Sequence, residues 1–421
     1  MQFLQRPGPW LWILLAAGIL LRAFLAFGTE GTYDVLIWTE HASGVARDGL
    51  VAHYRSDATF NHPPFVGWAM AELWKLAQWT GLPFRALYRA LTAAIDLGSA
   101  LLLRRLIAAS TWRWLAFGLY CVAPAALVFS AQHGNSDSII AFALLACCLA
   151  VGAGRPILCG VVIGLALWIK LPVLVAAPAI FFALPTWRDR LRCGLVALAV
   201  GAATYVPAFV AAPSLVGQRV FGYQGIQLHT LGKPPIWVWG IKNFCFTAFG
   251  PDTTRWPAWA LWRIDHANAI AIALIAAYAF LRRREKSALG LAQTITGCLA
   301  LFYGSIEAWS FQYFAWSVPF WFTRGALFAL CANVFAGGYV YCLYAHLCDD
   351  WLLRGAWDFA GHRQWPNWIP VLRDAALLTF LVFGIVWFAL AVRAELRARR
   401  SVDEGDEALA AGEKPSVRGP E

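Results

Sequence analysis

Residues 1–28 read MQFLQRPGPWLWILLAAGILLRAFLAFG, in which a basic residue is followed by a long apolar run. A run of roughly 20 apolar residues is long enough to cross the ~30 Å hydrocarbon core as a helix. It has no clear small-residue cleavage site and many similar runs follow it, so we expect an uncleaved first helix. Over 421 residues the chain is 60% hydrophobic and 14% charged. We therefore expect an all-α polytopic membrane protein, because backbone polar groups in lipid need internal hydrogen-bond partners.

The net charge of +10 comes from basic residues that gather beside the apolar runs. The clusters are Arg104-Arg105, Arg188–Arg192, Arg282–Lys286 and Arg393–Arg400. This placement is typical of cytoplasmic helix ends facing anionic lipid, and it argues against a groove for nucleic acid. With these clusters in the cytoplasm, the pattern predicts about twelve spans with both termini inside.

The apolar runs place the spans along the chain. We expect them near 9–28, 86–103, 113–130, 139–153, 157–171, 173–185, 193–212, 257–281 and 287–304, with the last ones ending near 393. A short external segment, SIEAWSFQ, follows the ninth span. Residues 1–393 would form one transmembrane domain, and residues 394–421 a disordered cytoplasmic tail, because they are rich in charge, Ala and Gly.

Residues 63–79, PPFVGWAMAELWKLAQW, are the ambiguous segment of the topology. Glu72 and Lys75 interrupt the run, and a crossing here would place Arg104-Arg105 outside. We expect a membrane-parallel amphipathic helix within a first external loop at 29–84. Whether 63–79 crosses the membrane stays open.

The first external loop concentrates acids, aromatics and histidines in residues 29–64, TEGTYDVLIWTEHASGVARDGLVAHYRSDATFNHPP. Asp34 could act as a general base toward a hydroxyl, or simply cap a helix. Glu40, six residues later, is a helper or a solvent-exposed charge. His62 could donate to a phosphate or a sugar hydroxyl, or belong to a rigid Pro-Pro turn. Asp48 and Asp57 read as surface charges.

A second polar group lies between two apolar runs, in the segment HGNSD at 133–137. His133, Asn135 and Asp137 are either functional or part of a tight turn with a helix cap. Lys170, at the end of the run GLALWIKLP, could supply positive charge for a lipid-linked phosphate. The alternative for this lysine is snorkelling at a helix end.

Several basic residues lie on the expected outer side, against the general charge trend. Arg22 and Arg89 are near the outer ends of two spans, and a guanidinium fork suits a phosphate. The second external loop, 213–256, adds Arg219, His229 and Lys233. We expect these cations to help hold an anionic partner that carries a phosphate.

The ten cysteines lie mostly inside apolar runs, where a thiol is usually a small packed side chain. No CxxC pair and no Cys/His ligand spacing occurs in the sequence. We therefore expect no structural metal site and no cofactor.

Several motifs together resemble a known family. These are YDVLIWTEHA, GLVAHYRSDATFNHPPF, Asp96 in the second span, AALVFSAQHGNSDSI, and GVVIGLALWIKLPVL. They are similar to motifs of the GT-C glycosyltransferases, above all the enzymes that use polyprenyl-phosphate sugars, including bacterial mannosyltransferases and the PIG-M branch. The resemblance covers residues 10–190, the module that this family shares, whereas 191–393 match only in hydropathy.

The resemblance implies a function and a site. An inverting transferase would move a mannose-like hexose from a polyprenyl phosphate to a hydroxyl of a lipid or glycan acceptor. The reaction would take place on the extracytoplasmic face of a bacterial inner membrane. Asp34 would be the base, His133, Asn135 and Asp137 would line the site, and Lys170 would contact the donor phosphate. No acidic DxD pair is present, which speaks against a catalytic metal.

Two other functions remain open from the residues. A lipid-linked-sugar transporter or flippase would need charged residues facing a central cavity, and Asp96 is the clear mid-span carboxylate. A membrane-bound O-acyltransferase would need a histidine deep in a helix, whereas the histidines here are expected in loops.

Overall fold

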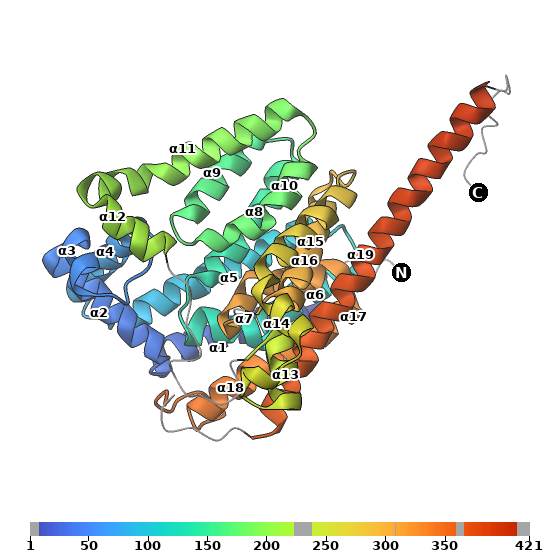
Figure 1. The fold of residues 1–421 in the computed structure, drawn as a ribbon. Coiled ribbons are helices and arrows are strands. Elements are labelled where there is room, and N and C mark those ends of the chain that lie inside the picture. Colours follow the sequence, from blue (N-terminus) through green and yellow to red (C-terminus); the bar gives the residue numbers. More distant parts are fainter. Residues whose placement is uncertain (1–7, 223–237, 308, 359–365, 411–421) are drawn as a thin grey trace.

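The computed structural model describes residues 8–222, 238–307, 309–358 and 366–410, with only the backbone described for 401–410. All regular secondary structure in these ranges is helical (Figure 1). The largest apolar core draws residues from α1 and from helices between α5 and α19, whereas α2–α4 contribute to two smaller cores. The expectation of an all-α protein is therefore confirmed.

The first half of the chain forms the part of the bundle that carries the polar loops. Its helices are α1 (Pro9–Gly28), α2 (Tyr33–Asp48), α3 (Leu50–Ser56), α4 (Pro64–Thr80), α5 (Phe84–Leu106), α6 (Thr111–Cys121), α7 (Pro124–Leu127), the π-helical η2 (Val128–Gln132), α8 (Asp137–Gly152), α9 (Pro156–Leu167), η3 (Leu171–Ala176), α10 (Ala177–Ala183), α11 (Trp187–Ala211), α12 (Pro213–Val216) and η4 (Gly217–Phe221).

The second half packs against the first mainly where α16 contacts α8 and α10. Its helices are α13 (Gly240–Phe249), η7 (Thr253–Arg255), α14 (Ala258–Asp265), α15 (Ala267–Leu281), α16 (Ala288–Ser305), the 3₁₀ segments η8 (Phe311–Trp316) and η9 (Val318–Arg324), α17 (Ala326–Ala332), η10 (Asn333–Gly337), α18 (Gly338–Leu347) and α19 (Trp368–Ala410).

Six helices in the described residues are long and apolar enough to cross a membrane, or eight if each of two bent pairs counts as one span. These helices indicate an integral membrane protein, but they are fewer than the twelve spans expected. One reason is that α8, α9 and η3–α10 are apolar but short. The 16 residues of α8 cover only about 24 Å, less than the ~30 Å core.

The segment after α16, SIEAWSFQ, is expected as a short external loop. Its described residues are buried or half-buried: Glu307 is 4% exposed, and the chain continues as η8 and η9, which are mostly buried. No full span follows directly in this stretch, because two short 3₁₀ turns occupy it. The described residues of this segment therefore pack against the rest of the protein.

The segment expected as the first external loop folds into α2, α3 and α4, which lie together at one end of the bundle (Figure 1). Helix α4 is not among the candidate spans and packs along α2. Its apolar side chains Val66 and Met70 join a small core with Trp38, while Glu72 and Lys75 pair at 2.6 Å on its exposed face. This two-sided character is the one that the sequence predicts for 63–79.

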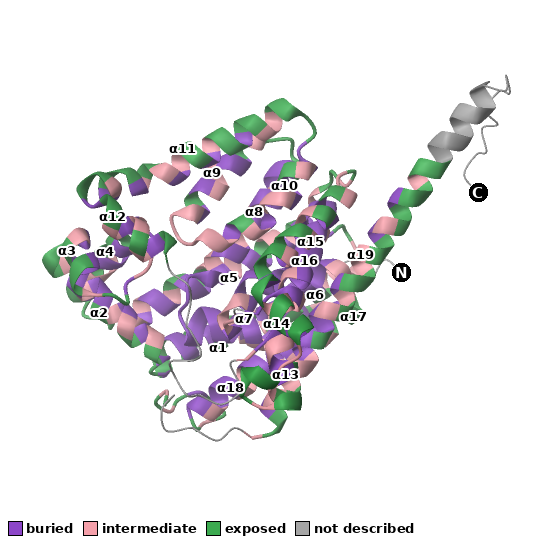
Figure 2. Cartoon of the chain, viewed as in Figure 1, coloured by how far each residue is buried: buried purple, intermediate pink, exposed green. Residues whose placement is uncertain are grey.

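The exposed apolar surface follows the long outer helices. In α16, 72% of the residues in its 18-residue apolar stretch are buried inside the protein. In α1 and α11 the corresponding share is 28% (Figure 2). Leu195, Leu198 and Val210 of α11 are each more than half exposed. Apolar side chains in such a continuous stripe fit contact with lipid chains.

Helix α19 continues past the expected end of the last span. It runs unbroken to Ala410, so the residues from 394 to 410, expected to be disordered, form helix. Glu395 gives one physical reason, because it binds Arg283 at 2.7 Å and Arg399 one turn later at 3.4 Å. The first of these contacts fastens α19 to the basic segment after α15.

Candidate active site around Asp34

A polar cluster forms where three segments meet. They are the start of α2, the bend that leads into α8, and η8. Asp34 lies in the first turn of α2. Its Oδ2 atom is 2.9 Å from Nε2 of His133 and accepts a hydrogen bond of 2.8 Å from Nε2 of Gln312. Its Oδ1 atom has no hydrogen bond among the described residues, and the side chain is 42% exposed. The carboxylate is thus held by one oxygen and open at the other.

His133 reaches Asp34 because the chain leaves regular α-helix just before it. Residues Val128–Gln132 form a π-helical turn, a rare geometry often found at functional sites. Gly134 then adopts φ +60°, a conformation that a side chain strongly disfavours. His133 itself is 1% exposed. The sharp turn thereby directs a buried imidazole at the start of α2.

Tyr344 of α18 contacts the other ring nitrogen of His133. Its hydroxyl lies 2.5 Å from Nδ1 of the imidazole, and the tautomer of the ring decides which of the two atoms donates. When the hydroxyl donates to Nδ1, a neutral imidazole carries its proton on Nε2, the atom that faces Asp34. The approach of Nε2 to Oδ2 is a close charge contact rather than a well-aligned hydrogen bond. Tyr344 and Asp34 therefore hold the ring from opposite sides.

A second ion pair lies at the start of α8. Lys170 Nζ is 2.9 Å from both carboxylate oxygens of Asp137, and Trp316 Nε1 donates to Oδ1 at 2.6 Å. Asp137 is fully buried, whereas the Lys170 side chain is 23% exposed. The position of Asp137 in the first turn of α8 suits a negative charge. Two of the three ammonium protons can bind Asp137, which leaves one for a ligand.

Asn135 and Gln312 connect the two ion pairs. Asn135 Nδ2 donates to Oε1 of Gln312 at 2.9 Å, and Asn135 Oδ1 accepts from the backbone N–H of Asp137 at 3.1 Å. Gln312 in turn donates to Asp34. A continuous chain of polar contacts therefore runs from Asp34 to Lys170.

His62 lies beside this chain. Its ring packs on Trp38 at 4.1 Å between centroids, and Trp38 is one turn after Asp34 on α2. The backbone carbonyl of His62 accepts from the Tyr54 hydroxyl at 2.5 Å. Burial, followed by the nearby Lys170 ammonium, holds the pKa of His62 well below its ordinary value. The imidazole is therefore neutral at neutral pH.

The electrostatics of the cluster keep Asp34 ionised. Burial raises the pKa of this carboxyl, but contact with His133, the hydrogen bond from Gln312 and the Lys170 charge together lower it by more. The net effect places the Asp34 pKa below its ordinary value. An anionic, partly exposed carboxylate therefore lies beside His133, with the charge of Lys170 nearby.

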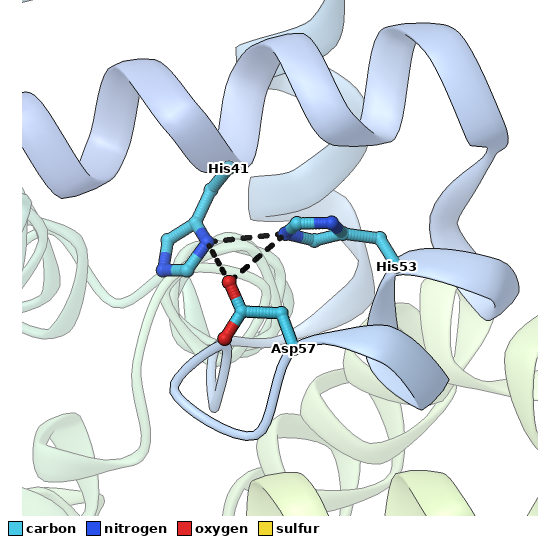
Figure 3. A group of neighbouring side chains, drawn as sticks. All are labelled: His41, His53 and Asp57. Atoms are coloured by element: carbon cyan, nitrogen blue, oxygen red, sulfur yellow. Dashed lines mark hydrogen bonds and ion pairs between the residues drawn. The ribbon is translucent and has the colours of Figure 1, made fainter.

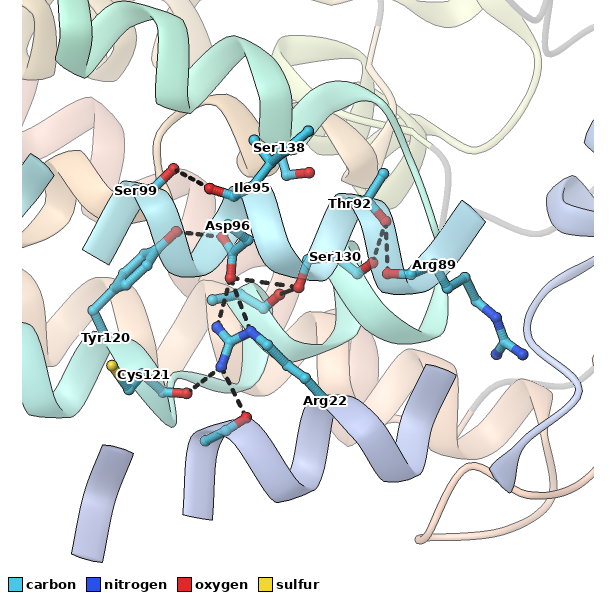
Figure 4. Close-up of polar contacts among 12 residues, drawn as sticks. Arg22, Arg89, Thr92, Ile95, Asp96, Ser99, Tyr120, Cys121, Ser130 and Ser138 are labelled. Carbon is cyan, nitrogen blue, oxygen red and sulfur yellow. Dashed lines mark hydrogen bonds and ion pairs between the residues drawn. The ribbon is translucent and has the colours of Figure 1, made fainter. Parts of the chain in front are cut away.

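Arg22 does not lie at this site. In α1 it pairs with Asp96 of α5, with NH2 2.5 Å from Oδ2, and it donates to the carbonyls of Gly18 and Cys121 (Figure 4). Tyr120 donates to the other Asp96 oxygen. Because these contacts use both the guanidinium and the carboxylate, Arg22 is not placed for the expected phosphate contact.

Arg89 likewise has a local role. It donates to the carbonyls of Leu25 and Thr29 at 2.9 and 2.8 Å and is 1% exposed. A Cβ at Gly31 or Gly134 would come within 3.0 and 2.5 Å of its side chain. Arg89 therefore caps the end of α1 and positions the turns that carry Asp34 and His133, in place of the expected contact with donor.

The other candidates from the sequence fall outside the cluster. Glu40 is exposed on α2. Arg219 donates to the carbonyls of Tyr54 and Ala58, at 3.2 and 3.4 Å, and so holds η4 against α3. His229 and Lys233 lie outside the described residues. Of the residues expected from the sequence, the structure brings together Asp34, His62, His133, Asn135, Asp137 and Lys170.

Three site residues escaped the sequence analysis: Gln312, Trp316 and Tyr344. They come from the half of the chain without recognisable motifs and lie in apolar, aromatic surroundings. The one available signal was Gln312, a lone amide in the run FQYFAW.

Comparison with known proteins adds no assignment. No protein-family model matches the chain, and no curated protein matches it significantly.

Proposed function

We propose that this protein is an inverting glycosyltransferase of the GT-C type, which moves a mannose-like hexose from a polyprenyl phosphate to a hydroxyl of a lipid or glycan acceptor. One observation carries the proposal. Asp34 is an ionised carboxylate with Oδ2 fixed by His133 and Gln312, and with Oδ1 open on a partly exposed side chain. A fixed carboxylate with one free oxygen is what a general base for an attacking hydroxyl requires.

The transfer step follows from this geometry. The acceptor oxygen would bond to the anomeric carbon as the carbon–oxygen bond to the phosphate breaks, with inversion at that carbon. The hydroxyl proton would pass to Asp34 Oδ1, and the polyprenyl phosphate would leave as an anion. Orientation of the carboxylate by His133 and Gln312 lowers the entropic cost of reaching this arrangement.

Lys170 is the cation best placed for the leaving phosphate. It is 23% exposed and keeps one ammonium proton beyond its contacts with Asp137. Positive charge near a leaving group stabilises the negative charge that grows on it. Neutral His62 could donate to the same phosphate or to a sugar hydroxyl.

The location of the reaction is part of the proposal. The basic clusters beside the spans favour a site on the extracytoplasmic face, and the family resemblance favours a bacterial inner membrane. Helices α2–α4 lie together at one end of the bundle, with Asp34 on α2 and His62 in the segment just before α4 (Figure 1). Transporter function has less support, because Asp96, its main candidate, is occupied by Arg22 and Tyr120.

A donor panel tests the proposal. Purified protein in lipid nanodiscs is incubated with polyprenyl phosphates carrying different hexoses and with a membrane lipid extract as acceptor. Mass spectrometry then follows donor consumption and product. We expect turnover with at least one donor, and loss of turnover in Asp34→Asn. Asp48→Asn, which changes an exposed carboxylate on the same helix, is the matched control.

Two results would contradict the proposal. One is near-native turnover in Asp34→Asn. The other is movement of intact lipid-linked sugar across proteoliposomes without any product, which would favour the transporter.

A further inference from the structure

Three side chains of the first external loop converge at a second place, formed by α2, α3 and the turn after α3. His41 Nδ1 lies 3.1 Å from His53 Nε2 and 3.2 Å from Asp57 Oδ2, and His53 Nε2 lies 3.8 Å from the same oxygen (Figure 3). The two histidines are 2% and 6% exposed, and the Asp57 side chain is 28% exposed. All three atoms therefore point at one partly buried spot.

Hydrogen bonding within the group leaves these three atoms poorly paired. Two neutral imidazoles present at most one proton each at the facing nitrogens, and a carboxylate presents none. If His41 Nδ1 donates to Asp57, His53 Nε2 can only share that same proton at 3.1 Å, and its 3.8 Å approach to the carboxylate is too long for a hydrogen bond. A cation at the centre would instead use all three lone pairs at once.

The spacing fits a small divalent ion. Ligand atoms about 2.1 Å from a tetrahedral Zn²⁺ lie roughly 3.4 Å from one another. The three separations, 3.1, 3.2 and 3.8 Å, bracket that value. Two imidazole nitrogens and one carboxylate oxygen are a donor set for Zn²⁺ and related transition metals, whereas Ca²⁺ and Mg²⁺ prefer oxygen ligands alone.

The surroundings orient the ligands. Asp57 Oδ1 accepts from the backbone N–H and the hydroxyl of Thr59, at 2.8 and 2.6 Å, which leaves Oδ2 for the ion. Phe60 packs its ring against both imidazoles, at 4.8 and 5.2 Å. Gly44 allows the His53 ring to approach α2, because a Cβ there would lie 2.6 Å from Nδ1. Such supporting contacts hold ligands in place at metal sites.

We propose that His41 Nδ1, His53 Nε2 and Asp57 Oδ2 bind one divalent transition-metal ion of the Zn²⁺ class. The ion would clamp α3 and the following turn onto α2, with water in the fourth position on the side of the half-exposed Asp57. The site differs from the expectation, drawn from the cysteine spacing, that the chain holds no structural metal. It does not depend on the proposed glycosyl transfer.

The clamp has a structural consequence for the loop helices. His41 lies seven residues after Asp34 on α2, two turns along the same face. The turn fixed by Asp57 leads directly into Phe60 and His62, and His62 packs on Trp38 of α2. An ion at this place would therefore order the segment that carries both Asp34 and His62.

Cobalt provides a visible probe of the site. The full chain is purified without a histidine tag, treated with chelator and titrated with Co²⁺, then with Zn²⁺. We expect one Co²⁺ per chain, with absorption bands in the visible range typical of low coordination number, and displacement of Co²⁺ by Zn²⁺. His53→Gln and Asp57→Asn should each weaken binding by about 10- to 100-fold or more, since each removes a ligand. Asp48→Asn, an exposed carboxylate of α2, should leave binding unchanged.

A second readout does not rely on variants. Limited proteolysis of the native chain should cut residues 49–63 faster after chelation, and Zn²⁺ should restore protection. Absence of saturable Co²⁺ binding by the folded native chain would overturn the proposal. So would Co²⁺ binding that persists unchanged in a folded His53→Gln/Asp57→Asn double variant.

Discussion

Two polar pairs join distant segments of this chain, and they differ in how fully their polar atoms are satisfied. Arg22 and Asp96 join α1 to α5, and both Asp96 oxygens have partners, Arg22 on one and Tyr120 on the other. Asp34 and His133 join α2 to the bend before α8, and one Asp34 oxygen remains open. The closed pair leaves no Asp96 oxygen without a partner, whereas the open pair leaves Asp34 Oδ1 for the proposed reaction.

The surroundings reinforce the difference. Asp96 is 3% exposed, and the helices around it belong to the candidate spans. Asp34 is 42% exposed at the end of the bundle, in helices that do not qualify as spans. Inside the bundle, burying a charge without a partner would cost free energy. Stability alone therefore explains why Asp96 is fully paired. At the end of the bundle, partial exposure lowers that cost.

The largest expected effect is on turnover at the open pair. Asp34→Asn removes the proton acceptor, and a positioned general base contributes about 10²- to 10⁴-fold to rate. We expect a loss of that order in kcat with an almost unchanged thermal midpoint. Donor consumption by mass spectrometry and unfolding in detergent measure the two quantities. If the thermal unfolding midpoint fell as far as in an Asp96 variant, the Asp34 contact would be structural, as the Arg22–Asp96 pair is.

The closed pair should show the opposite behaviour. Asp96→Ala leaves the Arg22 guanidinium, 2% exposed, without its partner, and breaking a buried pair costs about 3–5 kcal/mol. We expect a clear fall in the unfolding midpoint, with turnover of the folded fraction changed less than in Asp34→Asn. The double variant Arg22→Met/Asp96→Leu should recover much of the stability, since it removes both charges. If it does not, the pair has a role beyond packing.

Lys170 tests whether the second open group serves the donor. Lys170→Met removes a charge-assisted hydrogen bond to phosphate, worth about 1.5–3 kcal/mol, and should raise the donor KM by about 10- to 100-fold. It also leaves Asp137 buried and unpaired. Lys170→Met/Asp137→Asn should therefore regain stability but not donor affinity. Recovery of both by the double variant would show that Lys170 only neutralises Asp137.

The smallest effect is a shift in pH dependence. The Asp34 pKa lies below its ordinary value, so activity should persist on acidification and fall only as pH drops through that low pKa. His133→Gln removes the contact that lowers the pKa most, while burial, which raises it, remains. The acid limb of kcat/KM should move to higher pH in this variant. An unmoved limb would show that His133 does not tune Asp34.

Local residue patterns were sufficient for much of the site. Asp34, His133, Asn135, Asp137, Lys170 and His62 were recognisable because polar side chains between apolar runs have few purely structural reasons to occur. The same reasoning failed for Arg22 and Arg89. A basic residue near a helix end looks identical in sequence whether it faces a ligand or a partner 74 or 60 residues away.

The sequence by itself determined the helical membrane architecture, the polar segment that folds into α2–α4, and the segments that carry the candidate chemistry. Hydropathy, charge asymmetry and turn residues act over a few neighbours, so they can be read along the chain. Only the tertiary structure decided that Gln312 meets Asp34, that Trp316 meets Asp137, and that His41, His53 and Asp57 converge. Which helix faces pack together depends on side-chain fit across the whole bundle, and residues as far as 278 positions apart then become neighbours.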